Sequence, residues 1–166
     1  MQTDHTDMNE IIPEVIALTR AEIDRNNIVL RTELDPGLPR IVGDRVQLQQ
    51  VVLNLIMNAI EAMRASDRRE LHVTSQTDEA RNVLVSVADA GLGLDAGNWD
   101  QVFDAFYTTK ADGTGMGLAI SRAIIERHGG RIWAAANQPQ GAVFQCVVPG
   151  EQAAQIPGDQ AGYTIV

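Results

Sequence analysis

The sequence predicts an α+β two-layer sandwich, in which about three helices cover one face of a mixed, mainly antiparallel sheet. Apolar residues recur with helical spacing in three segments, and they alternate with polar residues in several shorter ones. The predicted helices are too few to cover both faces of a sheet. Helices and strands follow one another without an internal repeat, so we expect a single folded unit.

The first half of the chain contains two predicted helices and a strand. Asp7 and Glu10 have the spacing of a capping box, and apolar residues at helical spacing follow up to Ile23 despite Pro13. Segment 28–34 is β-branched and alternating, which predicts a strand that ends at the turn 35–39. Asp44, with Gln47 at the box position, predicts the start of a central helix whose apolar residues continue to position 63.

The second half predicts a hairpin, a helix and two final strands. Segments 71–76 and 83–88 alternate around the polar turn 77–82, which favours an antiparallel pair. A short helix is expected over 98–102, followed by a loop over 103–112 that Phe103 and Phe106 anchor to the core. The helix that starts at 118 ends at Gly129-Gly130, and strands are expected over 131–135 and 142–148.

Length and composition limit the domain organisation and the partners. At 166 residues the chain predicts one folded domain over 8–149, a flexible lead-in over 1–7, and a polar tail or linker over 150–166 that is ordered only in context. The net charge of −9 argues against nucleic-acid binding. No apolar run approaches the length of a bilayer span, and the acidic N-terminus excludes a secretory signal. A single cysteine, Cys146, indicates a reducing compartment and a buried thiol.

The segment Asp89-Ala-Gly91-Leu-Gly93 is the first candidate binding motif. An ionised aspartate accepts hydrogen bonds, and adenine offers an exocyclic amino group as donor. Glycines at 91 and 93 permit a positive φ and let a flat ring lie against the backbone. The alternative is a simple hairpin exit, because aspartate and glycine favour turns in many proteins.

The segment Gly113-Thr-Gly115-Met-Gly117-Leu is the second candidate motif. It directly precedes a predicted helix, whose free N–H groups and dipole favour an anion. It matches neither the dinucleotide fingerprint nor a Walker loop. The alternative is a flexible linker that caps a helix.

Polar side chains inside the apolar central helix are a third signal. Asn54 and Asn58 lie one turn apart, where an unsatisfied amide costs about 1–3 kcal/mol. Phosphates with their metal would satisfy these amides, and neighbouring backbone groups would do so too. Lys110 can reach a terminal phosphate or remain a solvated surface lysine.

The three histidines favour structural roles over phosphoryl acceptance. His5 lies in the polar lead-in, His72 in a predicted strand, and His128 at a helix C-terminus, where an imidazolium favours the helix dipole.

The combination of these motifs is far more specific for one protein family than any of the motifs alone. Asn58, Asp89-x-Gly91-x-Gly93, Phe103-x-x-Phe106 and Gly113-x-Gly115-x-Gly117 occur in this order. Together they strongly resemble the sequence boxes of the catalytic ATP-binding domain of sensor histidine kinases, over about residues 8–149. Segments 54–62 and 108–110 look closest to the nitrogen-regulation and oxygen-sensing branch. The fold implied by the resemblance is the ATP-binding sandwich shared with gyrase, heat-shock chaperones and mismatch-repair ATPases.

The resemblance implies a role for each motif. Asn58 would coordinate Mg²⁺, Asp89 would bind the adenine amino group, and residues 113–118 would cradle the triphosphate beneath a mobile lid at about 107–114. Many of these kinases have lysine where this chain has Glu61, so Lys110 is our candidate for the cation that opposes the phosphates. The positions implied to bind ATP are Asn58, Ala62, Asp89, Gly91, Gly93, Phe106, Thr109, Lys110, Gly113, Thr114, Gly115, Met116, Gly117 and Leu118.

One departure separates this chain from the hydrolytic members of that superfamily. Those members carry a glutamate one turn before the Mg²⁺-binding asparagine, whereas this chain has Asn54. An amide cannot act as a general base, which is consistent with phosphoryl transfer to a nucleophilic histidine. Asn54 and Lys110 are therefore the expected catalytic positions. Segment 5–10 lacks the proline and the preceding helix of the acceptor-histidine region, so we expect ATP binding without autophosphorylation.

The resulting expectation is a cytoplasmic catalytic domain that transfers the γ-phosphoryl group of Mg-ATP to a histidine. The acceptor would lie on a dimerisation domain of the parent kinase, which itself can be membrane-anchored, and a response regulator would be the indirect partner. No direct membrane contact is expected. Two alternatives stay open: a serine kinase of the anti-sigma-factor type, and a degenerate nucleotide-binding sensor module.

Overall fold

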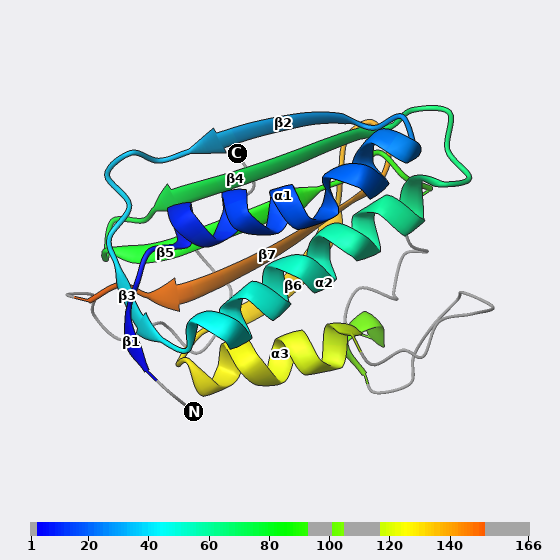
Figure 1. Ribbon diagram of the computed structural model, residues 1–166. Helices are drawn as coiled ribbons and strands as arrows, with labels where there is room; N and C mark the ends of the chain where they lie inside the picture. Colours follow the sequence, from blue (N-terminus) through cyan, green and yellow to red (C-terminus); the bar gives the residue numbers. More distant parts are fainter. Residues whose placement is uncertain (1–2, 93–100, 105–116, 152–166) are drawn as a thin grey trace.

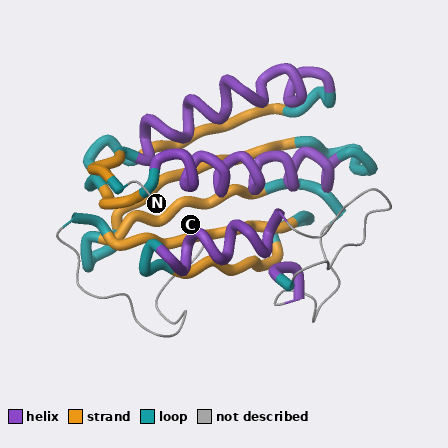
Figure 2. The backbone as a smooth tube through the Cα atoms, turned by 60° about the horizontal axis from the view of Figure 1, so that its bottom comes forward, coloured by secondary structure: helices purple, strands orange, loops and turns teal. Residues whose placement is uncertain are grey.

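The computed structural model describes residues 3–92, 101–104 and 117–151. Within these residues, helices α1 (Met8–Arg25), α2 (Arg45–Met63) and α3 (Gly117–Arg127) lie side by side on one face of a five-stranded sheet (Figure 1). The strand order is β2 (Val29–Leu34), β4 (Glu70–Thr77), β5 (Asn82–Ala88), β7 (Ala142–Pro149) and β6 (Arg131–Ala136). Figure 2 shows the same two layers from another side. The predicted two-layer α+β sandwich is confirmed.

The sheet is mixed, as predicted. β2 runs parallel to β4, and every other neighbouring pair in this sheet is antiparallel. The predicted hairpin is present as β4 and β5, with Ser75 opposite Val85. Alternation along β5 directs Val83, Val85 and Val87 into the core that the helices cover.

A small second sheet is not predicted by the sequence. β1 (Asp4–Thr6) pairs antiparallel with β3 (Ile41–Gly43), with His5 opposite Val42. β1 falls within the segment expected to be a flexible lead-in, because three polar residues carry no alternation signal. The expected helix over 98–102 lies mainly outside the described residues, and a short 3-10 helix, η1, covers Gln101–Phe103.

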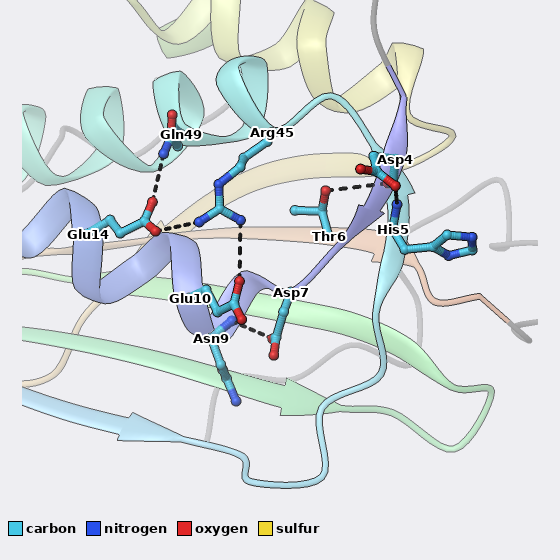
Figure 3. Close-up of polar contacts among 9 residues, drawn as sticks. All are labelled: Asp4, His5, Thr6, Asp7, Asn9, Glu10, Glu14, Arg45 and Gln49. Atoms are coloured by element: carbon cyan, nitrogen blue, oxygen red, sulfur yellow. Dashed lines mark hydrogen bonds and ion pairs between the residues drawn. The ribbon is translucent and has the colours of Figure 1, made fainter.

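The start of α1 differs from the predicted capping box. The Asp7 carboxylate accepts a hydrogen bond from the backbone N–H of Asn9 at 2.8 Å. Glu10 points instead toward Arg45 of α2, at 3.5 Å, and Arg45 also pairs with Glu14 (Figure 3). The carboxylates of α1 thus join α1 to α2. For α2 the predicted cap is confirmed, because Asp44 accepts from the N–H of Gln47.

The end of α3 is held against the start of α2 by His128. Its Nδ1 donates to the carbonyl oxygen of Ile124 at 2.8 Å, and its Nε2 accepts from the N–H of Asp44 at 3.0 Å. These two bonds confirm the structural role that was predicted for His128. A Cβ on Gly43 would lie 2.7 Å from the ring carbon Cδ2 of His128. Only glycine fits at position 43 without displacing the ring.

A single arginine side chain binds the backbone carbonyl groups that follow the C-terminal ends of α1 and α2. The guanidinium of Arg69 donates to the carbonyl oxygens of Asn26 at 2.8 Å, Arg64 at 2.9 Å and Ser66 at 3.0 Å. These carbonyls lie just after the ends of α1 and α2, where no further helical turn supplies an N–H and where the helix dipole favours a cation. Among the described helices, none has the length and apolar character that a bilayer span requires.

Candidate nucleotide-binding site

The central helix α2 carries three of the predicted site residues on one face. Asn54, Asn58 and Ala62 follow one another at a spacing of four residues, and all three are half-buried. Residues that share a helix face at this spacing lie one above the other. The fully buried residues of α2, such as Leu55 and Ile56, lie on the flanking positions that face the core. The helix therefore presents a narrow strip of two amides and one alanine, with the start of α3 against Asn54 and the loop after β5 against Ala62.

Asp89 is buried at the end of β5, where its carboxylate is held in place by backbone groups. The side chain is 1% exposed, and its Oδ1 accepts from the N–H of Gly91 at 2.8 Å and of Ala142 at 3.2 Å. The N–H of Asp89 in turn donates to the carbonyl oxygen of Ala142 at 2.9 Å. These bonds fix one carboxylate oxygen and so fix the direction of the other.

Gly91 brings the Asp89 loop into direct contact with α2. A Cβ at position 91 would lie 2.5 Å from the carbonyl oxygen of Ala62 and 3.0 Å from the Ala62 Cβ. Gly91 does not adopt a positive φ. The positive φ that the sequence analysis allowed for position 91 is therefore absent, and the structure shows close packing against α2 as the reason for a glycine there.

The loop between β6 and β7 supports Asp89 from the other side, which the sequence does not predict. The side-chain amide of Asn137 donates to the carbonyl oxygen of Asp89 at 2.7 Å. Gly141 has a φ of +111°, and a Cβ there would lie 2.0 Å from the same oxygen. The only sequence signal is a cluster of turn residues between two strands, which does not reveal what the turn contacts.

Asn54 connects α2 to the beginning of α3. Its Nδ2 donates to the carbonyl oxygen of Gly117 and to the hydroxyl of Ser121, both at 3.1 Å. Ser121 is fully buried and also donates to Gly117, at 3.0 Å. The amide of Asn54 is therefore satisfied by a neighbouring helix. Leu118 follows Gly117 in α3 and packs partly against the core.

The remaining predicted positions are only partly covered by the described residues. Asn58 is half-buried and takes part in a polar interaction. Phe103 is buried and packs edge-on against Phe144, with ring centroids 6.0 Å apart, which confirms the predicted anchor. The predicted positions outside the described residues are Gly93, Phe106, Thr109, Lys110, Gly113, Thr114, Gly115 and Met116.

The described part of the chain offers few charged ligands for a metal. Within residues 3–92, 101–104 and 117–151, no group of three or more His, Cys, Asp or Glu side chains is arranged to hold a metal ion. His5 contacts Glu151 and His72 contacts Glu33, at 3.0 Å in the second pair. Both pairs lie on the surface, in agreement with the structural roles predicted for these histidines.

Two glycines therefore allow the loop after β5 and the start of α3 to approach the two ends of the strip on α2 that Asn54, Asn58 and Ala62 form. Gly91 lies against Ala62 and Gly117 lies near Asn54, with the buried Asp89 carboxylate beside the first contact. Residues 43–152, which include this whole arrangement, match the family described as histidine kinase-, DNA gyrase B-, and HSP90-like ATPase. The chain belongs to this ATPase family.

Within the ATPase family, the similar proteins are sensor histidine kinases. The sensor protein FixL of Bradyrhizobium diazoefficiens is 45% identical over 142 residues, which are 86% of this chain and 28% of FixL. The nucleotide-free catalytic domain of the histidine kinase ThkA is 37% identical, with a TM-score of 0.81, over 90% of this chain and 97% of that domain. The chain thus corresponds to a histidine kinase catalytic domain, and it spans about a quarter of the length of FixL.

Two further structures show such domains with ligands or partners. Full-length ShkA in complex with AMPPNP has a TM-score of 0.80 at 27% identity, over 94% of this chain and 33% of ShkA. ThkA in complex with the response regulator protein TrrA has a TM-score of 0.76 at 34% identity, over 90% of this chain and 42% of ThkA.

Proposed function

We propose that this domain binds Mg-ATP and donates its γ-phosphoryl group to a histidine on a dimerisation domain of the parent kinase. The proposal depends on one observation: the buried Asp89 is bonded to Gly91, which lies against Ala62 at one end of the α2 strip, while α3 begins beside Asn54 at the other end. A purine and a triphosphate are the two ends of one ligand that fit a buried acceptor and a helix N-terminus.

The adenine end is supported by the geometry of Asp89. With Oδ1 engaged by two backbone N–H groups, the carboxylate cannot rotate freely. An acceptor held in this way selects a ligand that presents an N–H group in the matching direction, as the amino group of adenine does. Gly91 and Ala62 form the adjoining surface, on which neither residue has a side chain larger than a methyl group.

The phosphate end is proposed to begin with Gly117 and Leu118 of α3 and to continue into residues 113–116. The first N–H groups of a helix have no partner within the helix and attract anions. Asn54 and Ser121 fix the position of this first turn by their bonds to Gly117. Gly93, Phe106, Thr109 and Lys110 complete the proposed pocket, with Lys110 as the cation that faces the phosphates.

A magnesium ion is proposed to be held through the side-chain oxygen of Asn58 and the ligand's phosphates. Mg²⁺ is commonly bound by one or two protein oxygens together with substrate phosphates and water, so a large cluster of carboxylates is not needed. Asn58 is half-buried between Asn54 and Ala62, which suits this donor set. The ion supplies neutralisation of the phosphate charge.

The same residues explain a transferase in preference to a hydrolase. By the sequence resemblance, Asn54 occupies the position at which the hydrolytic members of the superfamily carry a glutamate that activates water, and an amide cannot accept a proton for that purpose. The residues of this chain would then orient the triphosphate and neutralise its charge. Orientation and charge neutralisation are sufficient for phosphoryl transfer to a reactive nucleophile. The similarity to named sensor histidine kinases favours histidine over the serine acceptor of the anti-sigma-factor type.

A reconstitution separates these possibilities. The domain is mixed with ATP radiolabelled in its γ-phosphate and with a helical hairpin that carries a candidate acceptor histidine. We expect label on the hairpin that is lost in acid and stable in alkali. Acid-stable label on a serine of a partner protein would support the serine kinase, and nucleotide binding with no transfer to any hairpin would support a sensor module.

The proposed setting is the cytoplasm, where ATP is available and the lone thiol stays reduced. The response regulator that receives the phosphoryl group from the dimerisation domain is an indirect partner. Nucleic acid is not proposed as a partner, because the net charge is −9.

A further inference from the structure

The backbone carbonyl group of Ala90, next to Asp89, receives donors from two distant parts of the chain. The hydroxyl of Ser66 lies 2.9 Å from this oxygen, and the side-chain Nε2 of Gln140 lies 3.0 Å from it. Ser66 follows α2, and Gln140 belongs to the turn between β6 and β7. Ala90 and Ser66 are both 4% exposed. The segment after β5 is therefore fixed from two sides through a single carbonyl oxygen.

The number of available protons shows why Gln140 is needed in this group of polar atoms. The Ser66 hydroxyl has one proton but lies 2.9 Å from two acceptors, the carbonyl oxygens of Ala90 and Arg68. The amide of Gln140 has two protons, and it reaches the Ser66 oxygen at 3.1 Å as well as the oxygen of Ala90. With Gln140 as the donor to both, the Ser66 proton is available for Arg68. Every acceptor in the group is then satisfied at once.

The Ala90 carbonyl is rigidly linked to the Asp89 carboxylate. Its oxygen and the N–H of Gly91 belong to one planar trans peptide unit, in which they point in opposite directions. That N–H donates to Oδ1 of Asp89 at 2.8 Å. A rotation of the peptide unit would move both groups together. Gln140 and Ser66 therefore control the direction of the Asp89 carboxylate through the backbone.

The turn that carries Gln140 also fixes the main chain of Asp89. Nδ2 of Asn137 donates to the carbonyl oxygen of Asp89 at 2.7 Å. The turn is itself closed by a bond from the N–H of Asn137 to the carbonyl oxygen of Gly141, at 3.0 Å. Asn137 and Gln140 thus bind the consecutive carbonyl groups of Asp89 and Ala90 from one closed turn.

A fixed acceptor selects its ligand more strongly than a mobile one. A carboxylate favours a base that presents an amino group and opposes a base that presents a carbonyl oxygen at the same position. A site that hydrogen-bonds one group rejects an analogue without it because the polar groups of the site are left unpaired. A carboxylate that can turn away escapes part of this penalty. The residues that prevent such a turn therefore contribute to selectivity.

We propose that Gln140, Asn137 and Ser66 are positioning residues that fix the direction of the Asp89 carboxylate and thereby set the preference for a 6-amino purine over a 6-oxo purine. This inference rests on the proposed role of Asp89 at the adenine end of the site.

A comparison of ADP with inosine diphosphate tests the proposal. Inosine diphosphate has a carbonyl oxygen where ADP has its amino group, and the two nucleotides share the ribose and the phosphates. Titration calorimetry on the full chain gives the ratio of the two dissociation constants, which we expect to favour ADP in the wild type. A change that only loosens the fold weakens both nucleotides in proportion and leaves this ratio unchanged. The ratio therefore reports the direction of Asp89.

Gln140→Glu is the main variant. Its side chain has the same length, but a carboxylate accepts where the amide donates. It would attract the Ser66 proton and place a negative oxygen beside the Ala90 carbonyl, so we expect the preference for ADP to fall about fivefold. Gln140→Lys keeps donors at this exposed position and should retain the wild-type ratio. The lysine charge acts equally on two nucleotides with the same phosphates.

Asn137→Asp is an independent second variant. The aspartate keeps an acceptor for the N–H of Gln138, which lies 2.9 Å from Oδ1, but loses the donor to the Asp89 carbonyl. The preference for ADP should again fall. Gln138→Ala, an exposed change in the same turn, is the matched control and should keep the ratio. Urea unfolding of each variant checks that the titrated protein is folded.

An unchanged ratio in both Gln140→Glu and Asn137→Asp, while Asp89→Asn abolishes the preference, would overturn this inference and leave the proposed function intact. An equal fall in Gln140→Lys and Gln140→Glu would overturn it too, because the donors at position 140 would then not matter. Equal binding of the two nucleotides by the wild type would refute the proposed role of Asp89 itself, and the inference with it.

Discussion

The side-chain amide of Asn54 donates to the carbonyl oxygen of Gly117, 63 residues further along the chain and 3.1 Å away. This bond joins the middle of α2 to the first residue of α3. The same amide also reaches the hydroxyl of the buried Ser121. A polar residue in the middle of an apolar helix is thus explained by its contact with the beginning of another helix.

Asn54→Ala should destabilise the domain and weaken triphosphate binding. The substitution removes the hydrogen bonds to Gly117 and Ser121, which corresponds to about 1–2 kcal/mol in urea-induced unfolding. Gln50→Ala, at an exposed position on the same helix, should change stability by less than about 0.5 kcal/mol. Equal unfolding midpoints for the two variants would contradict the role of Asn54.

Gly91→Ala should lower stability because the added Cβ has no room. It would lie 2.5 Å from the carbonyl oxygen of Ala62, which belongs to the backbone of α2 and cannot rotate away. We expect a loss of about 1–3 kcal/mol, measured by thermal or denaturant unfolding. In Gly37→Ala the nearest atom is 3.5 Å away, so this control should fold with normal stability.

Asp89→Asn should weaken adenine-nucleotide binding by about tenfold to a hundredfold. One charge-assisted bond of about 1.5–3 kcal/mol is lost, and an amide donor then faces the donor on the base. Titration calorimetry should show similar losses for ADP and ATP, because position 89 is proposed to lie at the adenine end of the pocket, away from the phosphates. Asp104→Asn, an exposed change, serves as the control. Wild-type affinity in Asp89→Asn would disprove the assignment.

Asp35 should contribute stability that depends on pH. The hydroxyl of Thr77 and then the N–H of Gly37 hold the pKa of Asp35 below its ordinary value of 3.8. A lowered folded-state pKa gives stability that is complete above the unfolded value and is lost as the pH falls through the folded value. The stability difference between the wild type and Asp35→Asn should therefore shrink as the pH falls below about 4. Thr77→Val should reduce this pH dependence, whereas the exposed change Asp67→Asn should leave it intact.

Cys146 should react with thiol reagents only when the domain opens. Burial raises the pKa of the Cys146 thiol to about 12, and the side chain is 2% exposed. The thiolate is the reactive form, so labelling at neutral pH should be slower by about a thousandfold or more than for an exposed thiol. Ala123→Cys, at an exposed position of α3, provides that comparison. Rapid loss of a single thiol in the native wild type would contradict the buried position.

The parts of the fold that the sequence predicts are those with strong local periodicity. The apolar spacing of α2 and the alternation of β4 and β5 are each complete within one segment, so a linear pattern reveals them. The order of the motifs likewise predicts Asp89 and Gly91 as site residues, and this assignment stays a prediction. β1 is different, because its three residues gain their structure from pairing with β3, which lies more than thirty residues away.

The parts that the sequence does not reveal depend on contacts between distant segments. Gly91 and Gly141 are glycines because the Ala62 and Asp89 carbonyl groups occupy the space of a side chain. The support of Asp89 by Asn137 has no signature in the spacing of these residues. The ring of His128 accepts a hydrogen bond from a backbone N–H at the start of α2, 84 residues away in the chain. Each of these facts requires two segments to be placed side by side.

The two contacts on α2 are separated by a fixed distance along the helix. Ala62, where the Asp89 loop rests, and Asn54, where α3 begins, are eight residues apart. At a rise of about 1.5 Å per residue, this interval is about 12 Å and cannot stretch. A nucleotide that bridges both ends, as we propose, must match that length, and one residue inserted between positions 58 and 62 would rotate the two ends apart by about 100°. In the proposed site, the fixed length of this helix would therefore select the nucleotide by its size.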